Sequence, residues 1–80
     1  MAPMCYVFCK TEFGKEKEVI DGLKKIEGVK EVNGLYGFYA IEVKVHEESL
    51  DKIRDTVTNK IRKHPYIYET NSLIVAGDIE

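Results

Sequence analysis

The sequence predicts a single α+β domain whose four strands and two helices follow the order βαββαβ, in a chain of 80 residues. Two stretches carry apolar residues at the helical period, and four others carry the apolar patterns of strands. The pattern is also symmetric about a central hairpin at 35–45, with a strand and a helix before it and a helix and a strand after it. A composition of 44% apolar and 32% charged residues fits a globular chain rather than a disordered one.

The first predicted strand is Met4–Thr11, and both of its faces are apolar. A strand of this kind is expected at the centre of the sheet and covered on both sides. Its two cysteines, Cys5 and Cys9, are four residues apart, so their Cα atoms lie roughly 13 Å from each other along a strand. A disulfide requires a Cα separation below about 7 Å. We therefore interpret both cysteines as small buried apolar residues rather than as a disulfide, a redox pair or metal ligands.

The first predicted helix is Lys15–Ile26, with its apolar residues at the helical period: Val19, Ile20, Leu23 and Ile26. Glutamates in its first turn and lysines in its last turn complement the helix dipole. Gly22 lowers the helix propensity by up to about 1 kcal/mol relative to alanine, which predicts close packing on the sheet at that point. Gly28 is expected to cap the helix at its C-terminal end.

The second and third strands are predicted at Val29–Tyr36 and Phe38–Val45, joined by a tight turn at Gly37. Asn33–Gly34 within the second strand is interpreted as a β-bulge. In the third strand one face is apolar and the other carries a glutamate and a lysine. The apolar face comprises Tyr39, Ile41, Val43 and Val45.

The second predicted helix is Leu50–Lys63, with Ser49 as its N-cap and Pro65 as the residue that stops it. Its apolar stripe consists of Leu50, Ile53, Val57 and Ile61. The last strand is predicted at Tyr66–Ala76, with a loose tail at 77–80. Period-2 alternation puts Tyr66, Tyr68, Thr70, Ser72 and Ile74 on one face, and Ile67, Glu69, Asn71, Leu73 and Val75 on the other.

The order βαββαβ in one compact domain implies a ferredoxin-like antiparallel sheet with both helices on one face. The other face then carries large apolar residues from the first and last strands and would remain uncovered. An apolar patch of that size is larger than monomers usually expose. We therefore expect a second copy to cover it through two-fold symmetry, in an assembly of the dimeric α/β-barrel type.

A net charge of −2 and a pI near 5.7 argue against binding nucleic acid through its phosphates. No signal peptide is visible at the N-terminus, and the longest apolar run, at 2–9, is too short to span a bilayer. These observations predict a cytoplasmic protein with no membrane partner.

The chain carries none of the usual signatures of an enzyme, a cofactor site or a metal site. It has no nucleophile with a recognisable base, no glycine-rich phosphate loop and no metal-ligand spacing, and His46 and His64 fall at element ends. The stretch 36–43 shares a glycine and an aromatic residue with the third strand of RNA-recognition motifs. It lacks their leading basic residue, and Ala40 and Val43 stand where the later stacking aromatics would be. We therefore expect no enzymatic activity, no cofactor and no direct contact with nucleic acid.

Three segments, in order and on matching elements, resemble one family. They are Gly28-Val29-Lys30-Glu31-Val32, Gly37-Phe38-Tyr39-Ala40, and the run from Ser49 to Val75 that includes Thr70-Asn71-Ser72. From about residue 5 to residue 76 the chain resembles the RAM domain, the C-terminal effector-binding domain of Lrp/AsnC transcription regulators. The resemblance implies a homodimer that assembles into higher oligomers and binds free amino acids at subunit interfaces.

In full-length members of that family a helix-turn-helix domain precedes the RAM domain. The first predicted strand here starts almost at Met1, so residues 1–80 are expected to form a single RAM-like domain for effector binding and oligomerisation, with no helix-turn-helix. A stand-alone module of this kind would act in amino-acid metabolism by co-assembling with a full-length Lrp/AsnC regulator.

The resemblance implies an effector site made by Gly37, Phe38, Tyr39 and Ala40 of the hairpin together with Thr70 and Ser72 of the last strand. The family hairpin reads Gly-x-Tyr-Asp, and Ala40 stands here in place of the carboxylate that meets the ammonium group of the effector. A charge-assisted hydrogen bond contributes on the order of 1.5–3 kcal/mol, so its loss would weaken amino-acid binding roughly ten- to a hundredfold. A purely structural role fits Gly37, Thr70 and Ser72 equally well.

Two other functions remain open at this point. A small enzyme of the dimeric α/β-barrel group, monooxygenase-like or heme-handling, would share the sheet-on-sheet dimer, but it would require a histidine or another polar group inside the barrel. A pure assembly partner would form mixed oligomers without binding any ligand.

Overall fold

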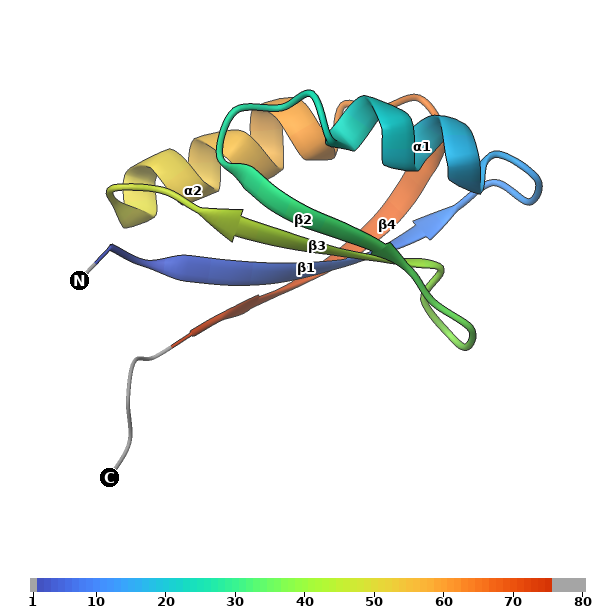
Figure 1. The fold of residues 1–80 in the computed structure, drawn as a ribbon, viewed down its shortest axis with the longest axis horizontal. Helices are drawn as coiled ribbons and strands as arrows, with labels where there is room; N and C mark the ends of the chain where they lie inside the picture. Colours follow the sequence, from blue (N-terminus) through green and yellow to red (C-terminus); the bar gives the residue numbers. More distant parts are fainter. Residues whose placement is uncertain (1, 76–80) are drawn as a thin grey trace.

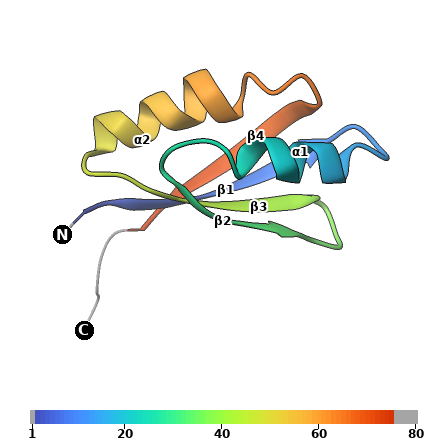
Figure 2. The same ribbon diagram turned by 45° about the horizontal axis from the view of Figure 1, so that its top comes forward.

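The computed structural model describes residues 2–75 and has a four-stranded antiparallel sheet with two helices on one face (Figures 1 and 2). The strands are β1 (Met4–Thr11), β2 (Val29–Gly34), β3 (Ile41–His46) and β4 (Ile67–Ile74). The helices are α1 (Glu16–Leu23) and α2 (Leu50–Thr56), and α2 continues into the π-helical turn η1 (Val57–Ile61). This is the predicted ferredoxin-like βαββαβ fold. The predicted end of the last strand at Ala76 and the tail at 77–80 lie outside the described residues.

The sheet order is β2-β3-β1-β4, which confirms the central position predicted for β1. On β1, Val7 pairs with Val43 of β3 on one side and with Ser72 of β4 on the other. Cys5, Val7 and Cys9 point toward the helices and are fully buried. They pack with residues of β3, α1, α2 and η1 that are almost fully buried: Ile41, Val43, Val45, Val19, Leu23, Ile53 and Ile61. The core therefore lies between the sheet and the helix layer.

The first helix is shorter than the sequence predicts. It ends at Leu23, and backbone bonds from Lys25 to Gly22 and from Ile26 to Leu23 close tighter turns in place of the last helical turn. Gly22 does mark a close approach, but not to the sheet: a Cβ there would lie 3.1 Å from Nε2 of His64, in the connection before β4.

The connection between β2 and β3 also differs from the prediction. β2 ends at Gly34 and β3 begins at Ile41, so residues 35–40 form a wide loop rather than a tight turn between longer strands. The loop is closed by a hydrogen bond from the Leu35 amide to the Ala40 carbonyl, and Phe38 and Tyr39 pack on side chains of β1 instead of extending the ladder. The predicted bulge at Asn33–Gly34 is wrong, because both residues pair in register and the irregularity lies between Val29 and Glu31.

The second helix begins as predicted, because the Ser49 hydroxyl accepts a hydrogen bond from the Lys52 amide at 3.1 Å. The residues Ile53, Val57 and Ile61 of the predicted stripe are buried, whereas Leu50, in the first turn, is 53% exposed. Thr56 is buried although the apolar pattern does not mark it, and its hydroxyl donates to the carboxylate of Glu47.

The last strand departs from simple alternation because β1 and β4 change register between Lys10 and Thr11. Ile67 consequently pairs with Thr11 and is buried with the core, whereas Tyr68 is 68% exposed. The predicted faces are therefore wrong for Ile67, because the bulge inserts an unpaired residue and reverses the alternation beyond it. For residues 70–74 the predicted alternation is confirmed by the register with β1.

Candidate functional site

A groove runs between α2 and the edge strand β4, on the helix side of the sheet. Its volume is about 400 Å³, within the range of small-molecule sites. We name it the α2–β4 groove, and its lining residues are Cys5, Leu50, Ile53, Arg54, Val57, Thr58, Arg62, Thr70, Ser72 and Ile74. It therefore contains Thr70 and Ser72, two of the six residues that the sequence predicts for an effector site.

The groove exists because short side chains lie where the helix layer meets the edge of the sheet. In register, Thr70 is opposite Cys9 and Ser72 is opposite Val7, so both hydroxyl side chains point to the same side as the core. Longer apolar residues at these two positions would fill the space. The hydroxyls instead leave it open and line it with polar atoms.

The helical wall of the groove is shaped by η1. Arg54, Thr58 and Arg62 are spaced at four-residue intervals and all line the groove. In a regular α-helix a residue eight positions on is rotated by about 80° around the axis, which would carry Arg62 away from the line of Arg54. The wider turn, in which the Arg62 amide bonds the Val57 carbonyl at 2.9 Å, reduces that rotation. The π-helical turn thus keeps both guanidinium groups along one groove.

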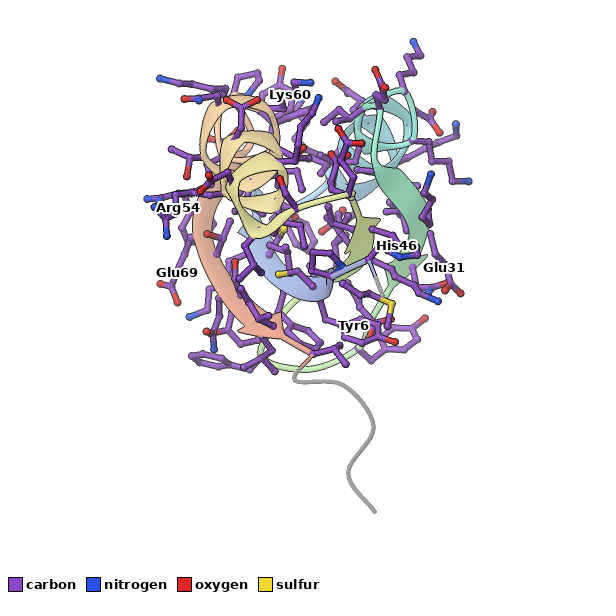
Figure 3. All side chains as sticks on the ribbon, turned by 90° about the vertical axis from the view of Figure 1, so that its left-hand side faces the viewer. Tyr6, Glu31, His46, Arg54, Lys60 and Glu69 are labelled. Carbon is purple, nitrogen blue, oxygen red and sulfur yellow. The ribbon has the colours of Figure 1, made fainter. Side chains whose placement is uncertain are left out.

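The charge in the groove is positive and unpaired. Its lining has two arginines and no carboxylate, and within residues 2–75 neither Arg54 nor Arg62 has a carboxylate within 4.0 Å. Two nearby acids are engaged elsewhere, since Glu69 pairs with Lys10 at 3.6 Å and Asp55 accepts from Asn59 at 2.7 Å. Figure 3 shows Arg54 directed to the β4 side of α2.

The thiol at the bottom of the groove adds no negative charge at neutral pH. Burial raises the pKa of the Cys5 thiol, although the hydroxyl of Ser72 opposes that shift. Cys9, deeper in the same face, has its pKa raised by burial to about 12. Both thiols are neutral at physiological pH and not disulfide-bonded, as the sequence predicts.

Two of the other predicted site residues, Phe38 and Tyr39, lie on the opposite face of the sheet. In the loop at 35–40, Phe38 packs edge to face on Tyr39 at 5.2 Å, and Tyr39 contacts Phe8 at 6.0 Å between ring centroids. The Lys10 ammonium lies 3.5 Å from the centre of the Phe38 ring, a cation–π contact. Gly37 has φ +139°, a conformation that favours glycine.

One chain therefore does not bring the six predicted residues together. Thr70 and Ser72 line the α2–β4 groove, whereas Phe38 and Tyr39 pack with Lys10 and Phe8 on the face away from the helices, and Ala40 packs against the hydrophobic core. Ala40 itself is only partly exposed, and its amide donates to the Cys9 carbonyl at 3.0 Å. The sequence interpretation also missed Arg54 and Thr58, although the spacing of Arg54, Thr58 and Arg62 on one helix was visible.

Neither histidine lines the α2–β4 groove. Nδ1 of His64 accepts a hydrogen bond from the Tyr66 amide at 3.2 Å, and His46 lines a shallow polar hollow at the end of β3. Across residues 2–75, histidines, cysteines and acidic residues form no cluster of three or more that could hold a metal ion. Within the same part of the chain, no helix is both long and apolar enough to cross a bilayer.

Comparison with solved structures relates this geometry to known proteins. The chain is 36% identical to FFRP-DM1, with a TM-score of 0.87, and the match covers 94% of this chain and 99% of that one. It is 25% identical to AsnC from E. coli, with a TM-score of 0.87, where it covers 95% of this chain but only 52% of AsnC. No family model and no curated protein matches the sequence.

A third structure shares the fold alone, at 12% identity and a TM-score of 0.83. It is a transcriptional regulator from Neisseria meningitidis in complex with L-methionine, and the match covers 98% of this chain and 52% of that one. The domain thus occurs both as nearly the whole of one solved chain and as about half of larger regulators.

Proposed function

The chain belongs to the Lrp/AsnC family and has the fold of its RAM domain, and from this premise we propose that it is a regulatory module rather than an enzyme. In this proposal it assembles with copies of itself and binds a small amino-acid effector. The observation that carries the proposal is the match to FFRP-DM1 over nearly the full length of both chains. The Neisseria meningitidis structure that shares this fold is that of a transcriptional regulator.

Self-assembly is supported by the face of the sheet that the helices leave uncovered. Tyr6 and Phe8 of β1 alternate with the buried core residues and point to this face, and Leu73 beside them is 54% exposed. Figure 3 shows Tyr6 on the side of the sheet opposite the helices. A second copy related by two-fold symmetry would bury these residues, and a full-length Lrp/AsnC regulator could supply the same surface in a mixed assembly.

Effector binding is supported by the α2–β4 groove and by the hairpin loop, which two chains could bring together although one does not. L-methionine bound to the Neisseria regulator supports an amino acid as the effector of this fold. The proposed effector residues remain Gly37, Phe38, Tyr39, Ala40, Thr70 and Ser72, each set contributed by a different subunit.

Thermal unfolding in the presence of each common amino acid at millimolar concentration tests the effector, and mass measurement of the free protein tests the assembly. A ligand at a hundred times its dissociation constant adds about 2.7 kcal/mol to the free energy of unfolding. For a domain of this size that corresponds to a midpoint raised by roughly 10 °C. If no amino acid raises the unfolding midpoint, the amino-acid effector is overturned and the chain is a pure assembly partner. A monomeric mass would overturn the proposed self-assembly.

Ala40→Asp is expected to create or tighten amino-acid binding, roughly ten- to a hundredfold, because it supplies a carboxylate for the ammonium group of the ligand. Calorimetric titration of the variant and the unmodified chain measures the change. Ala40→Asn is the matched control, since it adds the same bulk without the charge. If both variants leave the affinities unchanged, the hairpin does not form part of the site.

A further inference from the structure

We propose that the α2–β4 groove selects a small aliphatic carboxylate without an ammonium group, such as a 2-oxo acid, and that Arg54 and Arg62 determine this selectivity. The inference rests on the regulatory, self-assembling module of the proposed function, and it replaces the amino-acid effector with another class of carboxylate. It differs from that function in placing selectivity in the charge of the groove rather than in the hairpin.

The charge of the groove lining is positive. Two guanidinium groups line the groove and no carboxylate does, while Glu69 and Asp55 contact Lys10 and Asn59. A guanidinium presents a planar set of donors that matches a carboxylate, so such a pair recognises an anion by shape as well as by charge. An anion entering the groove therefore meets two guanidinium groups and no carboxylate in the lining.

The side chains of the groove provide no charged partner for an ammonium group. An amino acid brings both a carboxylate and an ammonium, and the hydrogen bonds of an ammonium are strongest with a negatively charged acceptor. The acceptors among the lining side chains are hydroxyl oxygens and the neutral thiol of Cys5. The hairpin offers no carboxylate either, because residue 40 is alanine. The two arginines would in addition repel the ammonium.

The rest of the groove lining combines hydroxyl groups with an apolar wall. Thr58, Thr70 and Ser72 provide hydroxyls that can donate to a carbonyl oxygen, such as the one a 2-oxo acid carries next to its carboxylate. Leu50, Ile53, Val57 and Ile74 provide an apolar wall for a short aliphatic chain. This mixture suits a small organic acid better than a bare inorganic anion.

The π-helical turn is an independent observation for the same site. It places Val57, Thr58 and Arg62 along the groove and aligns Arg62 with Arg54. Single π-helical turns within α-helices occur frequently at functional sites. Here the turn lies in the wall of the groove, at the point where it determines the position of the second guanidinium.

Calorimetric titration of the full chain at neutral pH with matched pairs of ligands tests the inference. Each pair consists of an amino acid and its 2-oxo acid: alanine and pyruvate, leucine and 4-methyl-2-oxopentanoate, glutamate and 2-oxoglutarate. For at least one pair, the dissociation constant of the oxo acid is expected to be at least tenfold lower than that of its amino acid. Arg54→Gln and Arg62→Gln are each expected to weaken that binding at least tenfold, because each removes one charge-assisted contact.

Lys60→Gln is the matched control, because it removes the same charge from the same helical segment outside the groove lining. Figure 3 shows Lys60 on the side of the helix layer away from the sheet. The affinity of the Lys60→Gln variant for the oxo acid should equal that of the unmodified chain. Equal losses in all three variants would indicate a diffuse effect of net charge and would overturn the assignment to the groove.

Other outcomes separate this inference from the proposed function. If amino acids bind as tightly as oxo acids, and if the affinities for both are unchanged in the two arginine variants, the inference is overturned and the amino-acid effector stands. Inorganic sulfate binding as tightly as the oxo acids would overturn the carboxylate assignment. If nothing binds and Arg54→Gln changes the mass of the assembly, the groove is a contact between copies, and both effector assignments fail while self-assembly stands.

Discussion

The two faces of the sheet are formed by alternate residues of the same strands, and these residues differ in how deeply they are buried. On β1, Cys5, Val7 and Cys9 are fully buried under the helices, whereas their neighbours Tyr6 and Phe8 are only partly buried on the other face. The first face is closed by the chain itself and supplies the hydrophobic stabilisation of the fold. The second face is not covered by the helices. Folding and the proposed assembly therefore depend on separate sets of side chains, interleaved at every second position.

The largest expected difference between the two faces comes from a matched pair of leucines. Leu23, the last residue of α1, is fully buried in the core, and Leu73 is 54% exposed on the uncovered face. Leu23→Ala should lower the free energy of unfolding by about 2–5 kcal/mol, because it leaves a cavity in the core. Leu73→Ala should lower it by less than about 1 kcal/mol in dilute solution, since little area is lost to water.

Urea unfolding at low protein concentration measures both leucine variants. Sedimentation at higher concentration should then show weaker self-association for Leu73→Ala than for the unmodified chain. Equal destabilisation by the two variants at low concentration, or unchanged association, would contradict the division between the faces.

Two glycines on different sides of the sheet differ by a smaller amount. Gly28 precedes β2 with φ +95°, and a Cβ there would clash with the Glu47 carboxylate that accepts from Thr56. Gly37 in the hairpin has φ +139° and open space around it. Gly28→Ala should therefore lower the free energy of unfolding by about 2–3 kcal/mol, and Gly37→Ala by about 1 kcal/mol from the backbone alone.

Chemical denaturation of both glycine variants gives these values. A Gly37→Ala variant as unstable as Gly28→Ala would show that the hairpin is held in place as firmly as the core side. That result would contradict the proposed difference in stability between the hairpin and the helix-covered side of the sheet.

A third difference between the faces is a dependence of stability on pH that belongs to the buried face. The Cys9 thiol has its pKa raised by burial from 9.0 to about 12, so it stays neutral in the folded chain at a pH where the unfolded chain ionises. Its contribution to stability is complete below pH 9 and is lost as the pH rises toward 12, by up to about 1.4 kcal/mol per pH unit.

Urea unfolding from pH 7.5 to 10.5 under reducing conditions, with Cys9→Ala as the control, isolates this effect. The variant is less stable at every pH, but its stability should fall less steeply above pH 9, because tyrosines and lysines are common to both proteins. Parallel curves would mean that the thiol is not shielded from water as the closed face requires.

Local pattern was sufficient for much of the fold. The bounds of β1, the start of α2 at its Ser49 cap and the buried residues Val19, Leu23, Ile53 and Ile61 follow from periodicity and capping within a few residues of chain. The order of these elements then leaves few topologies, which is why the sheet and the central position of β1 were predictable.

What the sequence alone did not determine depends on contacts between residues far apart in the chain. The aromatic residues at 36–39 have high strand propensity, yet packing of Phe38 and Tyr39 on Lys10 and Phe8 makes them part of a loop. The bulge that buries Ile67 arises from its register with Thr11, and no alternation within β4 reveals it.

The candidate site illustrates the same division. The hydroxyls at 70 and 72 could be recognised from a motif, whereas the groove around them exists only because α2 packs beside β4 and η1 turns Arg62 toward it. Periodicity along the chain determined which residues are buried, because burial repeats with the local geometry of each element. The tertiary structure decided which polar residues share a groove, because that depends on how separate elements are brought side by side.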